Sequence, residues 1–381
     1  SSNISLPVDY NFYDDIKAFS KDKIKQKFKK QIYSEKYHES NFLGYWRDKI
    51  RGVGTRNDII ILGTSSKTNS FVRVLSNKLN KTINLKKYSN IDGIIPLAHT
   101  EGGEQNPNNL NLVLRTLSGF FIHPNVGAIL IVDYGNESIN NKNFEKFLID
   151  NKYPYKDVIH KFFSIDNGFE DCLIEGANIV NNWLNKVNLS IRTNQPLKYL
   201  KLALQCGGSD AFSGISGNPV VSWVSKEIIS LGGFSNLAET DELIGAEPYI
   251  LENVKDYETA SKFLNTIERF KKWAKAHGAS AEGNPSGGNK YRGLYNITLK
   301  SIGAGRKKHP DVRLDKVIDY GELMTTPGYY FMDSPGNDLE SIAGQVASGC
   351  NLIFFRYESF HGEIYRSSDR YAHYQTAMSV P

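Results

Sequence analysis

Short apolar runs alternate with stretches of helical periodicity along the first half of this 381-residue chain. The runs are rich in β-branched residues and predict strands over 58–64, 93–99 and 126–133. The stretches that follow them predict helices over 71–79, 110–120 and 144–149. Continuously apolar strands that alternate with helices are typical of a parallel sheet covered on both faces.

The second half repeats this alternation. Strands are predicted over 200–204, 234–238, 328–332 and 351–355, and the longest helix over about 254–277, with Gly278 placed to cap it. We therefore expect an α/β protein made of two Rossmann-like parallel-sheet domains packed together, plus a Lys-rich N-terminal arm. The predicted boundaries are 1–40 for the arm, 41–195 for the first domain and 196–381 for the second.

The amino-acid composition is that of a globular protein. The chain is 40% hydrophobic and 23% charged, as in ordinary globular proteins, and no apolar run is long enough to span a bilayer. The net charge of +5 owes much to a lysine run over 21–30, which favours a solvated helical face over a nucleic-acid site. No secretory signal is visible, and the three cysteines form no CxxC pair. We expect a cytoplasmic protein with neither nucleic acid nor membrane as a partner.

The turn Cys206-Gly207-Gly208-Ser209-Asp210 carries the clearest chemical signal. It joins an apolar strand to a predicted helix, so its backbone N–H groups lie at the carboxyl end of a sheet, an arrangement that favours anionic ligands. Cys206 has a second interpretation, because a lone cysteine after a buried strand is usually a small hydrophobic residue.

Acidic side chains lie in several other loops beside glycine or amide residues, at Glu101, Glu239, Glu247 and Asp333, and some of these loops end an apolar strand. Carboxylates that converge at one edge of a sheet suit a hard metal ion or an acid–base pair, although each could instead cap a helix. His99 ends a strand at this edge and is a candidate ligand or base, although a lone histidine is more often structural. Lys290 follows a Gly-Gly-Asn loop and suits an anionic substrate group, with a surface lysine as the alternative. No Walker loop, HExxH, GxSxG or dinucleotide fingerprint occurs, which argues against NTPases, zincins, α/β-hydrolases and Rossmann dehydrogenases.

Longer motifs carry a resemblance to a known family. The segments 206–219, 232–247, 283–285, 288–290, 300–304 and 331–336 resemble, in order, the altronate/galactarate dehydratase family, which also includes the large subunit of sulfolactate sulfo-lyase. The similarity covers roughly residues 42–355. It implies a metal-dependent, usually iron-stimulated dehydratase that removes water from an aldonate or aldarate to give a 2-keto-3-deoxy acid.

The resemblance also implies functional residues. The expected catalytic residues are Asp210, Glu239, Glu247, Lys290 and His99. The expected substrate-binding residues are Gly207, Gly208, Ser209, Ser213, Asn284, Asn289 and Asp333. The expected metal ligands are His99, Glu101 and Cys206, which would hold Fe²⁺ or Mn²⁺, with Mg²⁺ and Ca²⁺ as alternatives.

Departures from the family pattern leave alternatives open. Gly103 and Asn136 stand where the family usually has cysteines, so only Cys206 of three thiolates is present. Either oxygen ligands from Glu101, Glu104, Asn136 or Glu137 replace the thiolates, or the chain is a silent relative that binds an acidic sugar or a partner subunit. Sulfo-lyase or hydrolase chemistry in the same pocket is a further alternative. We also expect a small separate subunit to supply the family's N-terminal domain, and a homodimer.

Overall fold

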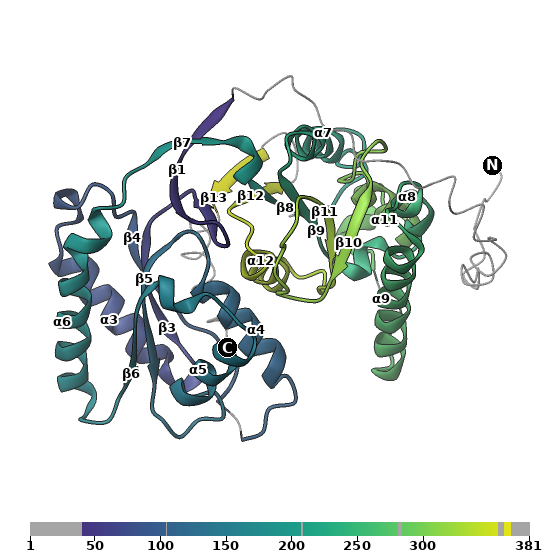
Figure 1. Cartoon of the computed structure of the whole chain (residues 1–381). Helices are drawn as coiled ribbons and strands as arrows, with labels where there is room; N and C mark the ends of the chain where they lie inside the picture. Colours follow the sequence, from purple (N-terminus) through teal and green to yellow (C-terminus); the bar gives the residue numbers. More distant parts are fainter. Residues whose placement is uncertain (1–39, 104, 207–208, 281–283, 357–361, 367–381) are drawn as a thin grey trace, which may run out of the picture.

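The computed structural model describes residues 40–103, 105–206, 209–280, 284–356 and 362–366 (Figure 1). The first of its larger sheets has the strand order β4-β3-β5-β6, and all neighbouring strands are parallel. Its strands are β3 (Asp58–Gly63), β4 (Gly93–Leu97), β5 (Val126–Asp133) and β6 (Ile159–Ser164). The helices that connect and cover them are α3 (Asn69–Thr82), α4 (Leu110–Phe121), α5 (Asn141–Asp150) and α6 (Phe169–Asn188).

The second large sheet has the order β10-β11-β9-β8-β12-β13, and only β13 runs antiparallel to its neighbour. Its strands are β8 (Lys201–Cys206), β9 (Phe234–Leu237), β10 (Leu314–Ile318), β11 (Gly328–Met332), β12 (Leu352–Arg356) and β13 (Gly362–Arg366). The helices of this half are α7 (Gly217–Ser230), α8 (Glu247–Leu251), α9 (Tyr257–Ala276), α10 (Gly287–Tyr291), α11 (Ile297–Gly305) and α12 (Asp338–Ala347).

A small antiparallel sheet lies beside the two large ones. Its order is β2-β1-β7, formed by β1 (Asn41–Asp48), β2 (Gly52–Gly54) and β7 (Thr193–Pro196). Because β1 precedes the first large sheet and β7 leads into the second, their pairing brings the two connecting segments together (Figure 1).

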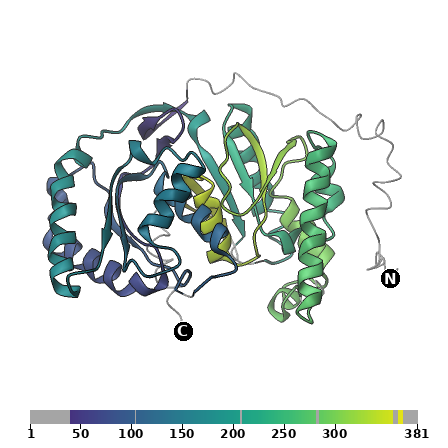
Figure 2. The same cartoon turned by 60° about the horizontal axis from the view of Figure 1, so that its bottom comes forward.

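Helices and sheets alternate in layers, with α4 and α12 packed between the two large sheets (Figures 1 and 2). The alternation along β3 shows how the sequence builds these layers. Ile59 and Ile61 point into one buried cluster with α3 and α6, whereas Ile60 and Leu62 point into another with α4 and α12. That second cluster also contains Ala203 and other side chains of the second sheet, so the two sheets share one core.

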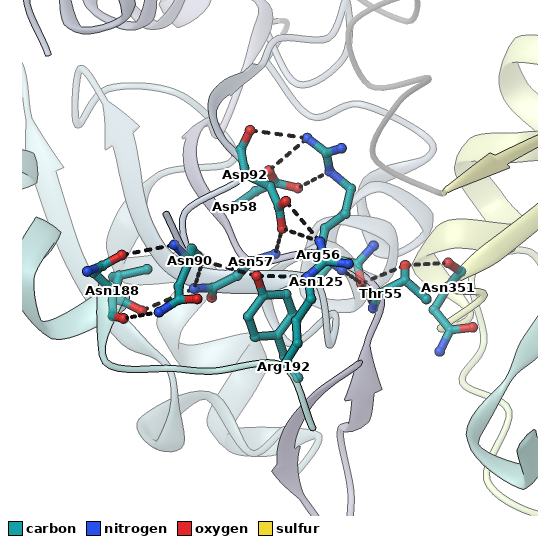
Figure 3. A network of polar contacts seen from close by, with 12 residues as sticks. Thr55, Arg56, Asn57, Asp58, Asn90, Asp92, Asn125, Asn188, Arg192 and Asn351 are labelled. Atoms are coloured by element: carbon teal, nitrogen blue, oxygen red, sulfur yellow. Dashed lines mark hydrogen bonds and ion pairs between the residues drawn. The ribbon is translucent and has the colours of Figure 1, made fainter. Parts of the chain in front are cut away.

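Polar side chains join the amino ends of the two sheets (Figure 3). Asn125, just before β5, accepts from the backbone N–H of Thr55 at 2.8 Å, and the Thr55 hydroxyl donates to the Asn351 carbonyl at 2.9 Å. Asn351 precedes β12 and donates through its side chain to the carbonyl of Val53 at 2.9 Å. Farther along, Arg192 pairs with Asp92 at 2.9 Å. The carboxyl ends of the strands, where ligands bind in parallel sheets, lie away from this network.

The predicted α/β class with parallel sheets covered by helices is confirmed. Gly278 follows α9 with φ 72° and donates to the Lys275 carbonyl at 3.0 Å, which confirms its predicted capping role. The division into two Rossmann-like domains near residue 196 stays a prediction, and all but the last residue of the Lys-rich arm lies outside the described residues. Among the described helices, none combines the length and apolarity that crossing a bilayer requires.

Candidate active site

The strongest concentration of buried charge lies beyond the carboxyl ends of β8, β9 and β11. Glu239 lies two residues after the end of β9 and is almost fully buried, at 1% exposure. Its backbone has φ 73°, a left-handed conformation that is uncommon for residues other than glycine. Such a conformation persists only where the surroundings impose it, and it often marks a functional site.

Glu239 forms a buried ion pair with Lys307. The Lys307 Nζ lies 2.7 Å from Oε2 of Glu239, and Gln205 at the end of β8 donates to Oε1 at 2.6 Å. Gln205 also donates to Asp338, the first residue of α12, at 3.1 Å. Burial raises the pKa of Glu239, while Lys307 opposes the rise and the carboxylate of Glu242 adds to it.

A second pair lies beside the first. Lys300 on α11 pairs with Oε1 of Glu242 at 2.9 Å and donates to Oδ1 of Asn284 at 2.7 Å. The amide nitrogen of Asn284 reaches Oδ2 of Asp241 at 3.3 Å. Asn284 therefore connects the carboxylate of Asp241 to the ammonium group of Lys300.

Two carboxylate oxygens in this cluster are buried without a hydrogen-bond partner among the described residues. They are Oδ1 of Asp241 and Oε2 of Glu242. Burial and the neighbouring Glu242 carboxylate raise the pKa of Asp241, against the lowering effects of nearby backbone N–H groups and of Lys300. Buried acceptors are almost always satisfied in native proteins, so both oxygens are suited to a ligand hydroxyl or a proton.

Asp333 joins the same region from the end of β11. Its Oδ1 accepts from the Thr240 hydroxyl at 2.8 Å, and Oδ2 pairs with the exposed Arg269 of α9. The Ser334 hydroxyl accepts from the backbone N–H of Glu239 at 3.0 Å, which ties the ends of β9 and β11 together.

Ser209 and Asp210 lie beside α10, which follows the segment that holds Asn284. Ser209 is buried, and its carbonyl accepts from Asn289 at 2.9 Å. Asp210 and Ser213 bond to each other, since the Asp210 carboxylate accepts from the Ser213 N–H at 2.5 Å. Gly207, Gly208 and the side chain of Cys206 lie outside the described residues, so their predicted roles stay predictions.

The structure thus brings together Glu239, Asn284 and Asp333, with Ser209 and Asn289 alongside. It places Glu247 and Lys290 differently. Glu247 begins α8, where burial raises the pKa of its carboxyl and where its charged neighbours are Lys271 and Glu268 of α9. Lys290 lies in the last turn of α10 with its side chain exposed.

The carboxyl edge of the first sheet holds the other predicted ligands. Nε2 of His99 lies 2.9 Å from the Gly63 carbonyl, and Nδ1 accepts from the backbone N–H of Glu101 at 3.3 Å. Burial lowers the pKa of His99, so the ring is neutral near pH 7. Glu137 accepts from the Tyr134 N–H at 2.9 Å, as a capping residue does.

Both ring nitrogens of His99 are therefore engaged, and this arrangement does not fit a metal ligand. A Cβ at Gly103 would come within 2.2 Å of the Ser66 hydroxyl oxygen, and Asn136 is exposed. Within the described ranges, no group of three or more His, Cys, Asp or Glu residues could hold a metal ion. Glu104 lies outside those ranges.

Asp241, Glu242, Lys300 and Lys307 were missed as functional residues by the sequence-based prediction. Three acids within four residues directly after an apolar strand, Glu239-Thr240-Asp241-Glu242, were the available signal. Lys300 lies in α11 and Lys307 lies two residues beyond it; both are buried, and buried lysines almost always have an acidic partner.

Comparisons with known proteins match most of the chain to one family. Residues 44–188 match the family model of the D-galactarate dehydratase/altronate hydrolase second domain, and residues 197–357 match that of the D-galactarate/altronate dehydratase C-terminal region. Altronate dehydratase of Escherichia coli K12 is 31% identical over 303 residues, 80% of this chain and 60% of the relative. Altronate dehydratase of Bacillus subtilis 168 is 30% identical over 321 residues, 82% of this chain and 61% of the relative.

A third relative is the (2R)-sulfolactate sulfo-lyase subunit beta of Chromohalobacter salexigens. It is 27% identical over 316 residues, 82% of this chain and 76% of that subunit. The chain thus spans about three fifths of the length of the two altronate dehydratases and about three quarters of the sulfo-lyase subunit.

Proposed function

We propose that this chain, which belongs to the D-galactarate/altronate dehydratase family, removes water from a sugar acid such as an aldonate or aldarate. The observation that best supports this proposal is the buried cluster of Asp241, Glu242 and Lys300. Two carboxylate oxygens of this cluster lack hydrogen-bond partners among the described residues. This cluster lies at the carboxyl edge of a parallel sheet, where ligands of such sheets bind.

The proposed base is Asp241. Its raised pKa suits it to remove the proton from C2, the carbon next to the substrate carboxylate, because a general base works best when its pKa approaches the working pH. The C–H electrons then form the C2–C3 double bond as the hydroxyl leaves C3. The resulting enol rearranges to the 2-keto-3-deoxy acid.

The proposed acid is Lys300. Its ammonium group carries three protons, and Asn284 and Glu242 accept two of them. The third proton is available for donation to the C3 hydroxyl group as it leaves. We propose that the Glu239–Lys307 pair behind these residues acts by positioning them, since both of its side chains are almost fully buried. The turn over 206–210, with Asn289, is proposed to bind the substrate carboxylate.

The divalent metal implied by the family resemblance remains a proposal, and no reaction step depends on it. The expected ligand His99 is engaged on both ring nitrogens. Metal analysis of the purified protein, with and without chelator, tests the Fe²⁺ or Mn²⁺ expectation. The small separate subunit and the cytoplasmic location also remain proposals.

The decisive experiment compares two buried carboxylates. Asp241→Asn should lower kcat for the best aldonate or aldarate by about 10²-fold or more, as loss of a general base does. Glu247→Gln removes another buried carboxylate with a raised pKa, but one on α8, and should keep kcat within about 3-fold of the wild type. Keto-acid formation is measured directly. If Glu247→Gln is inactive while Asp241→Asn is active, the site is wrongly assigned.

A second candidate is sulfo-lyase chemistry, favoured by one observation. The chain covers 76% of the sulfolactate sulfo-lyase subunit, more than it covers of either altronate dehydratase. Loss of a sulfo group in place of a hydroxyl needs the same proton removal. Sulfite release from 3-sulfolactate, without turnover of sugar acids, would select this candidate.

A further inference from the structure

An exposed arginine lies at the outer edge of the candidate site. Arg269 on α9 is 64% exposed, and its Nη2 pairs with Oδ2 of Asp333, which is only 19% exposed. A guanidinium group carries five N–H donors in a planar fork. Among the described residues, the Asp333 carboxylate is the one hydrogen-bond partner of this fork. The remaining donors can therefore bind a second anion that enters from solvent.

Asp333 fixes this arginine close to the proposed base. Its Oδ1 accepts from the hydroxyl of Thr240, the residue before Asp241, at 2.8 Å. The loop that begins with Asp333 also contacts the base directly. A Cβ on Gly336 would lie 2.5 Å from Oδ1 and 2.6 Å from Oδ2 of Asp241, so the carboxylate lies against this glycine. The loop after β11 thus contacts Arg269 at one end and Asp241 at the other.

The strand order places Arg269 and the proposed carboxylate-binding turn on opposite sides of the base. The strand β9, which leads to Asp241, lies between β8 and β11. The turn over 206–210 follows β8, whereas Asp333 and its partner Arg269 lie at the end of β11. Neighbouring strands are about 4.8 Å apart, so the ends of β8 and β11 are roughly 10 Å apart. A six-carbon acid with ~3 Å hydrogen bonds at both ends spans about 12 Å, so it can reach both sides.

We propose that Arg269 binds the second terminal carboxylate of the substrate and thereby selects aldarates over aldonates. This inference rests on the proposed dehydratase function. An aldarate carries a carboxylate at C6, where an aldonate has an uncharged hydroxymethyl group. Arginine matches the planar geometry of a carboxylate and can bind it through two parallel hydrogen bonds. The buried cations of the site are less suited to this role, because Lys300 and Lys307 are each paired with a glutamate.

Steady-state kinetics with a matched pair of acids tests the proposal. The two acids have the same configuration at C2 to C5 and differ only at C6. The wild type should have the higher kcat/KM for the aldarate. Arg269→Gln should lower this value about 10- to 100-fold, the effect of losing hydrogen bonds between charged groups, and should change that of the aldonate less than about 3-fold. The loss should appear in KM rather than in kcat, because the C6 carboxylate takes no part in the reaction.

Two further variants separate recognition of the substrate from a structural role. Arg269→Lys keeps the charge but loses the planar fork, so it should recover only part of the preference for the aldarate. Lys272→Met removes an exposed cation from the same helix and should leave both kcat/KM values unchanged. Equal losses for the two acids in Arg269→Gln would overturn the proposal, since the arginine would then act only by holding Asp333.

Calorimetric binding to Asp241→Asn makes the test independent of turnover. In this background the aldarate should bind at least about 10-fold more tightly than the aldonate, and the addition of Arg269→Gln should abolish the difference. A wild type that binds both acids but turns over neither would contradict the proposed reaction alone. Equal affinities for the two acids, or no measurable binding of either, would overturn the role of Arg269.

Discussion

Glu239 and Lys307 form an almost fully buried ion pair in the candidate site. Glutamate and lysine are almost never fully buried unless they are paired, and here their charged atoms lie 2.7 Å apart. The pair also holds Glu239 in its left-handed conformation, because the carboxylate is fixed from both sides by Lys307 and Gln205. Loss of one partner leaves the other charge buried and uncompensated.

Lys307→Met should therefore destabilise the protein by about 3–5 kcal/mol, measured as the free energy of unfolding in urea. Lys271→Met is the control. Lys271 pairs with Glu268 at 2.9 Å on the surface of α9, and its loss should cost under about 1 kcal/mol. If the two variants lost the same free energy of unfolding, the buried pair would contribute no more to stability than the surface pair does.

The buried side chain of His123 predicts that the stability of the protein falls at acidic pH. Burial lowers the pKa of His123 to about 3, although the hydrogen bond of its Nε2 to the Cys350 carbonyl opposes the shift. The ring is fixed on its other side by the Asn125 N–H, which donates to Nδ1. The unfolded chain binds a proton near pH 6.5, so stability is fully present above that pH and falls on acidification. Between pH 6.5 and pH 5 this histidine accounts for a loss of about 2 kcal/mol.

Urea unfolding at several pH values measures this contribution. His123→Gln should have a shallower loss of stability between pH 6.5 and pH 5 than the wild type, whatever its stability at pH 7.5. His277→Gln, at an exposed position, should keep the wild-type slope. A His123→Gln variant with the full wild-type slope would contradict the assignment.

Some site residues could be predicted from sequence and others could not. Glu239 and Asp333 lie in motifs that follow strands, and strand ends of a parallel sheet converge in any such fold. Asn284 lies between α9 and α10, so only its motif could predict it. Lys300 and Lys307 come from α11 and the turn after it, and only the packing of α11 against the segment after β9 brings them to the carboxylates. His99 also follows a strand, but the backbone engages both of its ring nitrogens, which strand position alone does not reveal.

The crossing of α4 and α12 determines how the two sheets approach each other. A Cβ on Gly119 of α4 would lie 2.1 Å from the Ala347 carbonyl oxygen at the end of α12. Because that oxygen belongs to the backbone, it cannot move aside as a side chain can. Only glycine permits this crossing distance.

Gly119→Ala should lower the free energy of unfolding by about 1–3 kcal/mol, the usual cost of overpacking. Gly176→Ala is the matched control inside α6. The nearest atom to its Cβ would be Cδ2 of Leu75 at 2.9 Å, the end of a flexible side chain. Better helix propensity offsets this contact, so the expected change is within about 1 kcal/mol. A neutral Gly119→Ala would mean that α4 and α12 separate without cost.

Elements with strong periodicity were predicted well. The predictions for β3, β5, β11 and α9 agree with the structure to within a few residues, because buried parallel strands are apolar throughout and α9 keeps a clear helical period. The strand β10 and the helix α12 were missed. The run Leu314–Ile318 is interrupted by Asp315 and Lys316, and the adjacent Ala343 and Gly344 weaken the apolar pattern of α12.

The molecule as a whole has two sheets but one continuous core. The cluster between the sheets includes Ile129 from the first and Ile353 from the second. At the amino ends, the side chain of Asn351 donates to the carbonyls of Val53 and Tyr199, so segments from both halves share one side chain. The expected boundary near residue 196 thus falls between two regions that contribute to the same buried cluster.

A shared core predicts that the two sheets unfold together. In native-state hydrogen exchange, the slowest amides of β5 and β8 should report the same free energy of opening, equal to that of global unfolding. Asn351→Ala removes side-chain bonds to both halves and should lower the two values in parallel, by about 1–3 kcal/mol. If the amides of β5 exchanged with a much lower free energy of opening than those of β8, the two halves would be independent domains. The junction at Asn351 would then be only a docking contact, and its loss would leave both exchange free energies unchanged.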